Sequence, residues 1–263
     1  MINNASRVDL TMVVPTYNER DRLGSLLERI FTACASRDVC AQVIIVDDNS
    51  PDGTGQLADE WARRGGVRVI HRPSKLGLGS AVLSGFAIAE TDVVGAMDAD
   101  LSHPPEVIPQ LYTALKSGDL DMVVASRYAP HGGTQAWPIG RFVLSRLGCA
   151  LSRPLTPVRD AMSGFFLLRS DCVQGFRTSA SGFKIGLELL VRAHPRRVAE
   201  VGYVFAGREA GQSKMTLREG LGFLRQLERL YAYALSASSV ARPELVTDER
   251  PAAIPQTASA RDS

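Results

Sequence analysis

The chain has 263 residues, a formal net charge of +2 and a hydrophobic fraction of 45%. This length suits one large α/β domain, and a near-neutral chain without a Lys/Arg-rich block gives no sign of nucleic-acid binding. The four cysteines form no C-x-x-C pair, which argues against a zinc site or a disulfide framework. The polar amino terminus lacks the apolar segment of a secretory signal, and no apolar run reaches the ~18–20 residues that span a bilayer. We therefore expect a cytoplasmic protein.

Apolar runs that suit buried strands alternate with amphipathic helical segments through the first half of the chain. We expect strands at 10–15, 42–46, 67–71, 93–97 and 121–125, a helix that carries Leu23 to Phe31, and helices over 54–64, 80–90 and 105–117. Strands that alternate with helices through short loops are typical of a parallel, doubly wound α/β sheet. A dinucleotide-binding fold is the obvious competitor, but no G-x-G-x-x-G follows the first strand, where that fingerprint belongs.

The pattern changes after residue 128. A Gly- and Pro-containing loop over 128–138 precedes a predicted helix at 139–152, a loop into a strand at 160–168, and a helix at about 184–193. A strand at 198–205, a basic glycine-containing loop and a last helix at 216–236 follow. Residues 1–236 are therefore expected to form a single domain. The segment 237–263, which is rich in Pro, Ala, Ser, Thr and Arg and has no aromatic residue, is expected to be disordered.

Two carboxylates stand where the 93–97 strand ends. Asp98 and Asp100 are spaced i, i+2 at the start of a loop, and they repel each other unless a cation lies between them. Oxygen ligands suit Mg²⁺ or Mn²⁺, which share their shell with waters and substrate phosphates. The alternative is two solvated residues that cap a helix beginning near Pro104. Glu19 and Asp48 follow two other strands, and parallel strand ends meet at one edge, which favours the metal site.

An ordered series of motifs covers most of the chain. It runs through Val14–Glu19, Val46–Gly53, Lys75–Gly79, Met97–Glu106, Ser126–Tyr128, Asp160–Phe165 and Arg208–Lys214. Over about residues 8–236 this series resembles the GT-A fold, family 2 glycosyltransferases, and specifically the dolichol- or polyprenol-phosphate mannose synthases. The resemblance implies a Rossmann-like, mostly parallel central sheet with helices on both faces and acceptor-side helices toward the carboxyl terminus. It also implies a nucleotide-sugar half at about 8–128 and an acceptor-side half at about 129–236.

The resemblance assigns a role to individual positions. The nucleotide-sugar contacts that it implies are Pro15, Tyr17, Glu19, Val46, Asp48, Asp98, Ala99, Asp100, Ser102, Arg127, Arg208 and Lys214. It places a divalent metal, Mg²⁺ or Mn²⁺, on Asp98 and Asp100, with Ser102 as a weak third ligand. Asp98, Asp100, Arg127 and Arg208 are the catalytic residues that it implies. Tyr17 has a plainer interpretation as an ordinary aromatic residue of a turn.

The acceptor side is implied by three positions, Ser163, Gly164 and Lys214. Arg208 and Lys214 match cations that hold the donor diphosphate and the acceptor phosphate, but taken alone they fit a solvated loop better. Asp160, just before this segment, can simply cap a turn. The implied reaction moves mannose from GDP-mannose to a polyprenyl (dolichyl-type) monophosphate with inversion, which gives polyprenyl β-mannosyl phosphate and GDP.

Other functions stay open. The same motifs suit a family 2 enzyme with another nucleotide sugar or acceptor, and a non-catalytic nucleotide-sugar-binding subunit is an alternative of a different class. Some members of the family carry transmembrane helices, and this sequence shows none. The Arg-bearing amphipathic helices 139–152 and 216–236 can either pack on the sheet or lie on an anionic membrane surface. A membrane-anchoring partner protein is the other way to bring the site to its lipid.

Overall fold

The computed structural model describes residues 8–135, 137–176, 184–206, 217–236 and 242–247. The strands are β1 (Leu10–Thr16), β2 (Ala41–Asp47), β3 (Val67–His71), β4 (Val93–Ala96), β5 (Met122–Ser126), β6 (Gly133–Thr134), β7 (Phe166–Arg169), β8 (Arg197–Gly202), β9 (Val204–Phe205) and β10 (Glu244–Leu245). The helices are α1 (Arg20–Ala35), α2 (Thr54–Arg64), α3 (Leu78–Phe86), η1 (Pro105–Val107), α4 (Ile108–Ser117), α5 (Ile139–Ser152), η2 (Ser170–Val173), α6 (Ile185–Arg192) and α7 (Leu217–Ser236).

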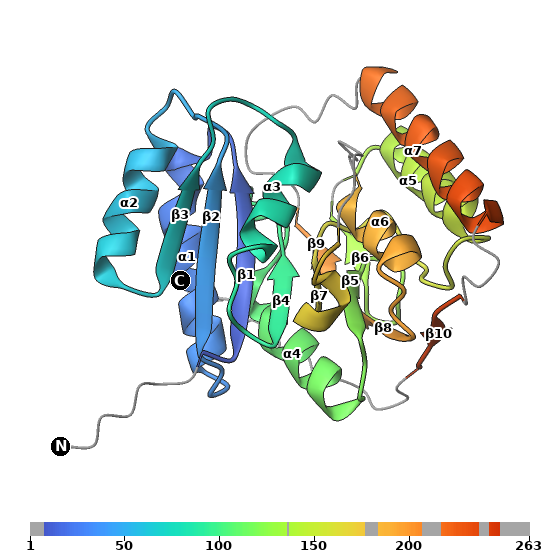
Figure 1. Ribbon diagram of the computed structural model, residues 1–263, viewed down its shortest axis with the longest axis horizontal. Helices are drawn as coiled ribbons and strands as arrows, with labels where there is room; N and C mark the ends of the chain where they lie inside the picture. Colours follow the sequence, from blue (N-terminus) through green and yellow to red (C-terminus); the bar gives the residue numbers. More distant parts are fainter. Residues whose placement is uncertain (1–7, 136, 177–183, 207–216, 237–241, 248–263) are drawn as a thin grey trace, which may run out of the picture.

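One eight-stranded sheet organises the molecule (Figure 1). Its strand order is β10-β8-β5-β7-β4-β1-β2-β3, and β7 alone runs antiparallel to both of its neighbours. The expected mostly parallel α/β sheet is therefore confirmed. Because β7 and β8 flank β5, the sheet continues without a break from the first half of the chain into the second.

Both faces of the sheet are covered by helices. Alternate residues of β1 point to opposite faces: Met12 packs with α1 and α4, whereas Val13 packs with α3 and α6. The side chains of Met12 and Val13 are both fully buried, as in strands that are covered on both sides. This double cover explains why the strands are continuous apolar runs rather than alternating ones.

The loops at the carboxyl ends of the strands turn sharply. Asn18, Asn49 and Leu101 have positive φ angles of 61°, 58° and 61° in the loops after β1, β2 and β4. Asn adopts this left-handed backbone easily, but a branched side chain such as that of Leu101 does so at a cost. The same left-handed backbone occurs at Asp38, Asp119 and His194, in the loops that precede β2, β5 and β8, so the chain turns sharply at both edges of the sheet.

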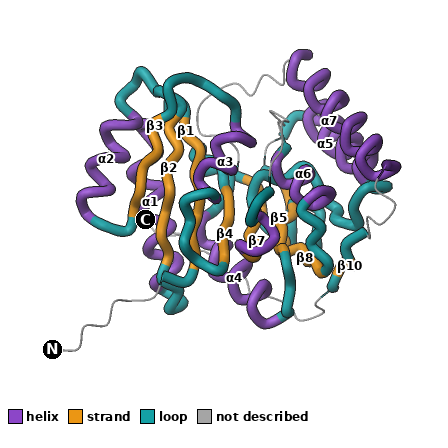
Figure 2. Tube along the Cα trace, in the orientation of Figure 1, coloured by secondary structure: helices purple, strands orange, loops and turns teal. Residues whose placement is uncertain are grey.

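The second half adds two helices outside the layered core. Helices α5 and α7 lie side by side at the upper right of Figure 1, and Figure 2 shows the same arrangement. Phe223 and Leu227 of α7 pack with Leu187 of α6, so α7 is attached to the sheet through α6. The single strand expected at 198–205 is instead two strands, because the chain leaves the main sheet after Gly202 and β9 pairs with β6. A side chain at Gly202 would place its Cβ atom 1.9 Å from the carbonyl oxygen of Pro130, so only glycine fits there.

The expected disorder of 237–263 is wrong for residues 242–247. Glu244 and Leu245 form β10, which adds a parallel strand to the edge of the sheet beside β8. The backbone N–H of Val246 donates to the carbonyl oxygen of Val198 at 2.8 Å, and the apolar side chains of Leu245 and Val246 pack on the core. A few apolar residues in a polar segment were enough to pair with an open sheet edge.

Candidate active site

Most of the predicted polar residues that the structure describes lie at the carboxyl edge of the sheet. Thr16 is in register with Asp47, and Asp47 with His71, so the loops after β1, β2 and β3 begin side by side. Because β7 is antiparallel, its first residue, Phe166, stands at this same edge opposite Ala96 of β4. The segment that precedes β7 is thereby brought beside the loop that carries the two aspartates.

Asp98 and Asp100 are held in different ways. The Asp98 side chain is 34% exposed, and its backbone N–H donates to Nδ1 of His103 at 3.1 Å. Asp100 is buried, and its Oδ1 accepts hydrogen bonds from both the backbone N–H and the hydroxyl of Ser102. The structure thus gives Ser102 the part of orienting Asp100, whereas a direct contact with a metal stays a prediction. Ala99, between the two aspartates, is buried.

His103 is a residue of this site that the sequence did not single out. Its ring is buried and stacks on Phe165 at 5.3 Å between centroids. Burial lowers the pKa of His103 against the opposing effect of Asp98 and Asp100. Its Nδ1 accepts the Asp98 N–H, so the neutral ring carries its proton on Nε2. Its position five residues after Asp98, in the same motif, was the available signal.

Arg127 and Asp160 form a buried ion pair. Nε and Nη2 of Arg127 donate to the two Asp160 carboxylate oxygens at 2.7 and 2.6 Å, and the Arg127 backbone N–H adds a third bond at 2.9 Å. Asp160 is therefore not a simple turn cap: it fixes both the main chain and the side chain of Arg127. Arg127 is first of all the partner of Asp160, and its expected contact with the donor diphosphate stays a prediction.

The segment that is expected on the acceptor side lies against Asp98. A Cβ atom built on Gly164 would stand 3.5 Å from Oδ1 of Asp98, so the Gly164 backbone faces that carboxylate. Ser163 is buried, and its backbone N–H donates to the carbonyl of Asp160. Lys184, at the start of α6, is a cation near this group that the sequence did not predict. Burial lowers its pKa, as does Arg127, while Asp98 and Asp160 oppose that shift.

The expected nucleotide side lies in the loops after β1, β2 and β3. Asp48 is buried and paired with Arg72, whose Nη2 also donates to the carbonyl of Gly77 at 3.0 Å. Tyr17 is partly exposed, and Nζ of Lys75 lies 4.2 Å above its ring. The Tyr17 ring is thus already stacked with a cation at the surface, where a flat base can also pack.

The other residues that are expected on the nucleotide side lie in or next to β1 and β2. Glu19 precedes α1 and pairs with Arg22 at 3.1 Å. The side chain of Val46 is fully buried in β2, so only its backbone can face a ligand, while Pro15 stands beside it in β1. Arg208 and Lys214, the two cations expected to bind phosphates, lie outside the described residues.

The carboxylates fit a metal that is shared with a substrate. Within the described ranges no three His, Cys, Asp or Glu side chains form a metal-binding group. Asp98 and Asp100 offer two hard oxygen donors on one loop, and Mg²⁺ or Mn²⁺ characteristically takes its other ligands from water and phosphate. Such a donor set suits an ion that binds together with a nucleotide diphosphate rather than alone.

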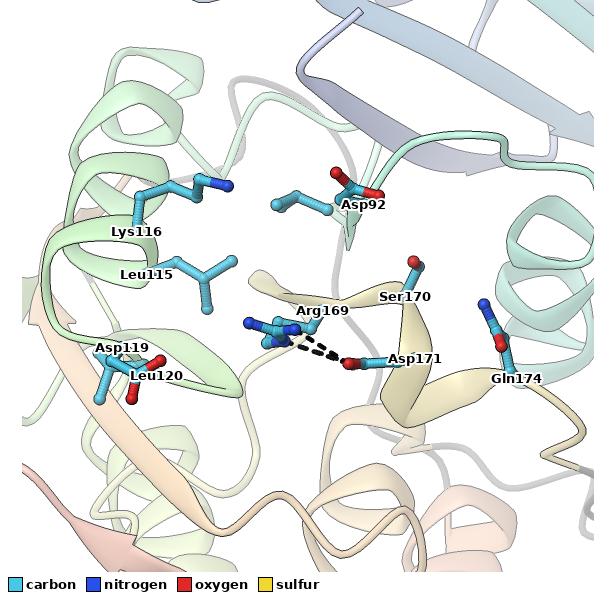
Figure 3. A pocket seen from close by; sticks show the side chains of 10 residues that line it. Asp92, Leu115, Lys116, Asp119, Leu120, Arg169, Ser170, Asp171 and Gln174 are labelled. Atoms are coloured by element: carbon cyan, nitrogen blue, oxygen red, sulfur yellow. Dashed lines mark hydrogen bonds and ion pairs between the residues drawn. The ribbon is translucent and has the colours of Figure 1, made fainter.

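Two surface hollows lie elsewhere. One, of about 260 Å³, is lined by Asp92, Lys116 and the ion pair of Arg169 with Asp171, and Figure 3 shows it between α4, the start of β4 and the end of β7. The other, of about 540 Å³, shares Asp92 and Lys116. Both lie where the parallel strands begin, which is the opposite edge from the aspartates. They do not belong to the candidate site.

Comparison with known proteins identifies relatives of this chain. A dolichol-phosphate mannosyltransferase of Pyrococcus furiosus is 39% identical over 225 residues, which are 84% of this chain and 63% of that protein. The dolichol-phosphate mannosyltransferase of Saccharomyces cerevisiae is 36% identical over 244 residues, which are 89% of this chain and 91% of the yeast protein. This chain therefore spans less than two thirds of the Pyrococcus protein but most of the yeast one.

The fold has solved counterparts. A mannosyltransferase of Pyrobaculum calidifontis, determined with GDP-mannose and Mn²⁺, superimposes with a TM-score of 0.63 at 18% identity, covering 88% of this chain and 65% of that one. This likeness supports the fold. Residues 11–176 match glycosyl transferase family 2. Because that match covers more than half of the sequence and the yeast relative aligns over nearly its whole length, the chain belongs to glycosyl transferase family 2.

Proposed function

We propose that this glycosyltransferase moves mannose from GDP-mannose to a polyprenyl (dolichyl-type) monophosphate, with inversion, and releases GDP. The observation that carries the proposal is the placement of Gly164 against Asp98, which brings the expected acceptor side to the expected metal side at one sheet edge. The names of the Pyrococcus and yeast relatives support the same sugar and lipid.

The residues of the candidate site would have separate roles in this transfer. Asp98 and Asp100 would hold Mg²⁺ or Mn²⁺, which when bound neutralises charge on the leaving diphosphate. The Arg127–Asp160 pair keeps the loop after β5 in place beside this point. A phosphate acceptor is already an anionic nucleophile, so the site needs no strong general base. The neutral, buried His103 is consistent with a positioning role for that ring.

We also propose that α5 and α7 present the site to a membrane surface. Apolar side chains on these helices point outward into solvent, namely Ile139, Phe142, Val143, Leu144, Leu147, Leu151, Leu221, Leu224 and Leu235. Helix α5 also carries Arg141 and Arg146, which suit anionic headgroups. No helix within the described ranges is long and apolar enough to cross a bilayer. A membrane-anchoring partner protein that covers the same face is the alternative.

One assay tests the proposed reaction. Purified protein is incubated in detergent with Mn²⁺ or Mg²⁺, polyprenyl monophosphate and, in turn, labelled GDP-mannose and other nucleotide sugars. We expect label in the lipid only from GDP-mannose, with GDP released only when both lipid phosphate and metal are present. Transfer from another donor would instead identify a different family 2 enzyme. Metal-dependent binding without turnover would indicate a nucleotide-sugar-binding subunit.

A further inference from the structure

Tyr203 lies in the bend between β8 and β9, at the carboxyl edge of the sheet. Its backbone N–H donates to the carbonyl of Ser126 at 3.1 Å, and its carbonyl accepts from the N–H of Gly133 at 3.0 Å. Its ring packs edge-on against His103 and Phe165, both at 5.9 Å between centroids. The side chain is 3% exposed. The position of the ring is therefore fixed by the backbone on one side and by aromatic neighbours on the other.

The hydroxyl at the tip of this ring has no hydrogen bond. Among the described residues Tyr203 Oη is one of two buried side-chain polar atoms without a hydrogen-bond partner, the other being Trp137 Nε1. The charged groups that act on Tyr203 are Arg127, Asp160 and Asp98, and Ser163 lies beside the hydroxyl without hydrogen-bonding geometry. Burial raises the pKa of Tyr203, so the group is a neutral O–H that can both donate and accept.

A buried hydroxyl without a partner is unfavourable for folding, and native structures rarely keep one without a reason. Phenylalanine would keep each aromatic contact of the Tyr203 ring and would remove the unpaired atom. The described contacts therefore give the hydroxyl no structural task. Its neighbours do suggest a task, because Asp98 and Ser163 are the expected metal-side and acceptor-side residues.

The sheet order indicates which part of a ligand would reach the hydroxyl. The loops expected to bind the nucleotide follow β1, β2 and β3, at one end of the order, and Asp98 follows β4. Tyr203 follows β8, on the other side of β4 and beyond β7 and β5. A nucleotide sugar whose base lies over β1–β3 and whose diphosphate meets Asp98 would extend its glycosyl group toward β5 and β8.

We propose that the Tyr203 hydroxyl is a specificity determinant of the glycosyl subsite and forms a hydrogen bond with a hydroxyl group of the transferred hexose. This inference depends on the proposed transfer from a nucleotide sugar and adds to it a residue that reads the sugar. The Tyr203 hydroxyl is neutral, so it suits a neutral sugar O–H. A charged phosphate is better matched by a cation such as Arg127. It does not take part in the bond-breaking step.

The test compares Tyr203→Phe with the wild type. We expect the variant to unfold thermally at the same temperature as the wild type or higher, and to bind GDP equally well, because GDP lacks the sugar. Its kcat/KM for GDP-mannose should fall about threefold to tenfold, the range that corresponds to one neutral hydrogen bond. One GDP-mannose analogue, deoxygenated at the contacted position, should cost the wild type the same factor and cost the variant nothing.

Tyr231→Phe is the matched control. The Tyr231 hydroxyl donates to the carbonyl of Leu151 at 2.7 Å, so its loss should lower the unfolding temperature and leave sugar discrimination unchanged. A Tyr203→Phe protein that is less stable, or one that keeps wild-type kcat/KM and still discriminates against every deoxy analogue, would overturn the inference. A wild type that transfers another sugar would refute the mannosyl assignment instead, and the same comparison, made with that donor, would still decide the role of Tyr203.

Discussion

Arg127 and Asp160 are joined by a two-pronged ion pair, with Arg127 8% exposed and the Asp160 side chain fully buried. The same carboxylate accepts the Arg127 backbone N–H, so one aspartate fixes the chain where β5 ends. The backbone N–H of Asp160 donates in turn to Glu200 of β8 at 2.9 Å. This link ties the loop before β7 to the end of β5 and to β8.

Replacing Arg127 by Met should reduce the free energy of unfolding by about 3–5 kcal/mol, because Asp160 would remain buried and charged without its partner. Urea unfolding at neutral pH measures this loss. If Arg127 instead serves only to bind phosphate, the variant would be as stable as the wild type and would lose activity alone.

A double variant separates the ion pair from packing. Arg127→Met with Asp160→Leu removes both charges, so we expect it to recover a large part of the stability that the single variant loses. Equal stability of the single and double variants would show that the cost of Arg127→Met comes from packing and not from the unpaired carboxylate.

Asp100→Ala should abolish turnover and metal-dependent GDP binding while the fold is kept, because Asp100 lies in a loop outside the strands and helices. The loss is expected because, among the described residues, no third His, Cys, Asp or Glu joins Asp98 and Asp100 as a metal-binding group that could replace the lost ligand. Circular dichroism reports the fold, and calorimetric titration of GDP with and without Mn²⁺ reports the site. Full activity in this variant would rule out the metal-binding role.

Ser102→Ala gives a graded companion to that experiment. Ser102 donates to Asp100 without being expected to touch the metal strongly, and loss of such an outer partner typically weakens metal affinity 10–100-fold. Thr113→Ala on α4, which removes a local hydrogen bond to the Pro109 carbonyl, is the control and should leave metal affinity unchanged.

The pair of Arg29 with Glu106 gives a prediction about pH. Burial acts to raise the pKa of Glu106, but hydrogen bonds from Arg29 outweigh it, and the pKa lies below its ordinary value. A carboxyl group whose pKa is lowered in the folded state contributes stability above its unfolded pKa, and this contribution is lost as the pH falls through the folded pKa. Both side chains are partly exposed, so Arg29→Met should cost only about 0.5–1 kcal/mol at pH 7.

Urea unfolding of Arg29→Met and wild type at several pH values checks this prediction. The difference between them should shrink as the pH falls below about 4.3, the ordinary pKa of Glu. Arg63→Met on the exposed face of α2 is the control for loss of a positive charge. A difference that is constant with pH would mean that Arg29 acts through packing of its alkyl chain.

Much of the fold could be predicted because the strands are covered on both faces. Runs such as Met12–Val14 are apolar without interruption, and their alternation with helical segments is enough to indicate a parallel sheet. What the sequence could not show is that β7 inserts antiparallel between β4 and β5. That insertion brings Gly164 to Asp98, although 65 residues separate them in the chain.

The site was predictable in part for the same reason. Asp98 and Asp100 follow a strand directly, so local sequence placed them at the carboxyl edge. The pairing of Arg127 with Asp160 and the unpaired hydroxyl of Tyr203 depend on contacts between segments far apart in the chain, which no spacing reveals. The role expected of Arg127 came from the family resemblance of its motif, and only its buried partner shows that it also holds the structure together.

The outward apolar face of α5 leads to the last prediction. Leu144→Glu with Leu147→Glu should reduce flotation of the protein with vesicles of phosphatidylcholine and phosphatidylglycerol, because both side chains are about half exposed and would bring charge to the lipid. Activity toward a short-chain, water-soluble polyprenyl phosphate should be retained, since neither residue belongs to the candidate site. Arg37→Gln with Arg63→Gln changes the net charge by the same two units at exposed positions of the other half, and should leave flotation nearly unchanged. Equal loss in both double variants would show that overall charge attracts the protein to the vesicles. No loss in either would assign the α5 face to a partner protein instead, because the exposed leucines would then have no part in holding the enzyme at the lipid.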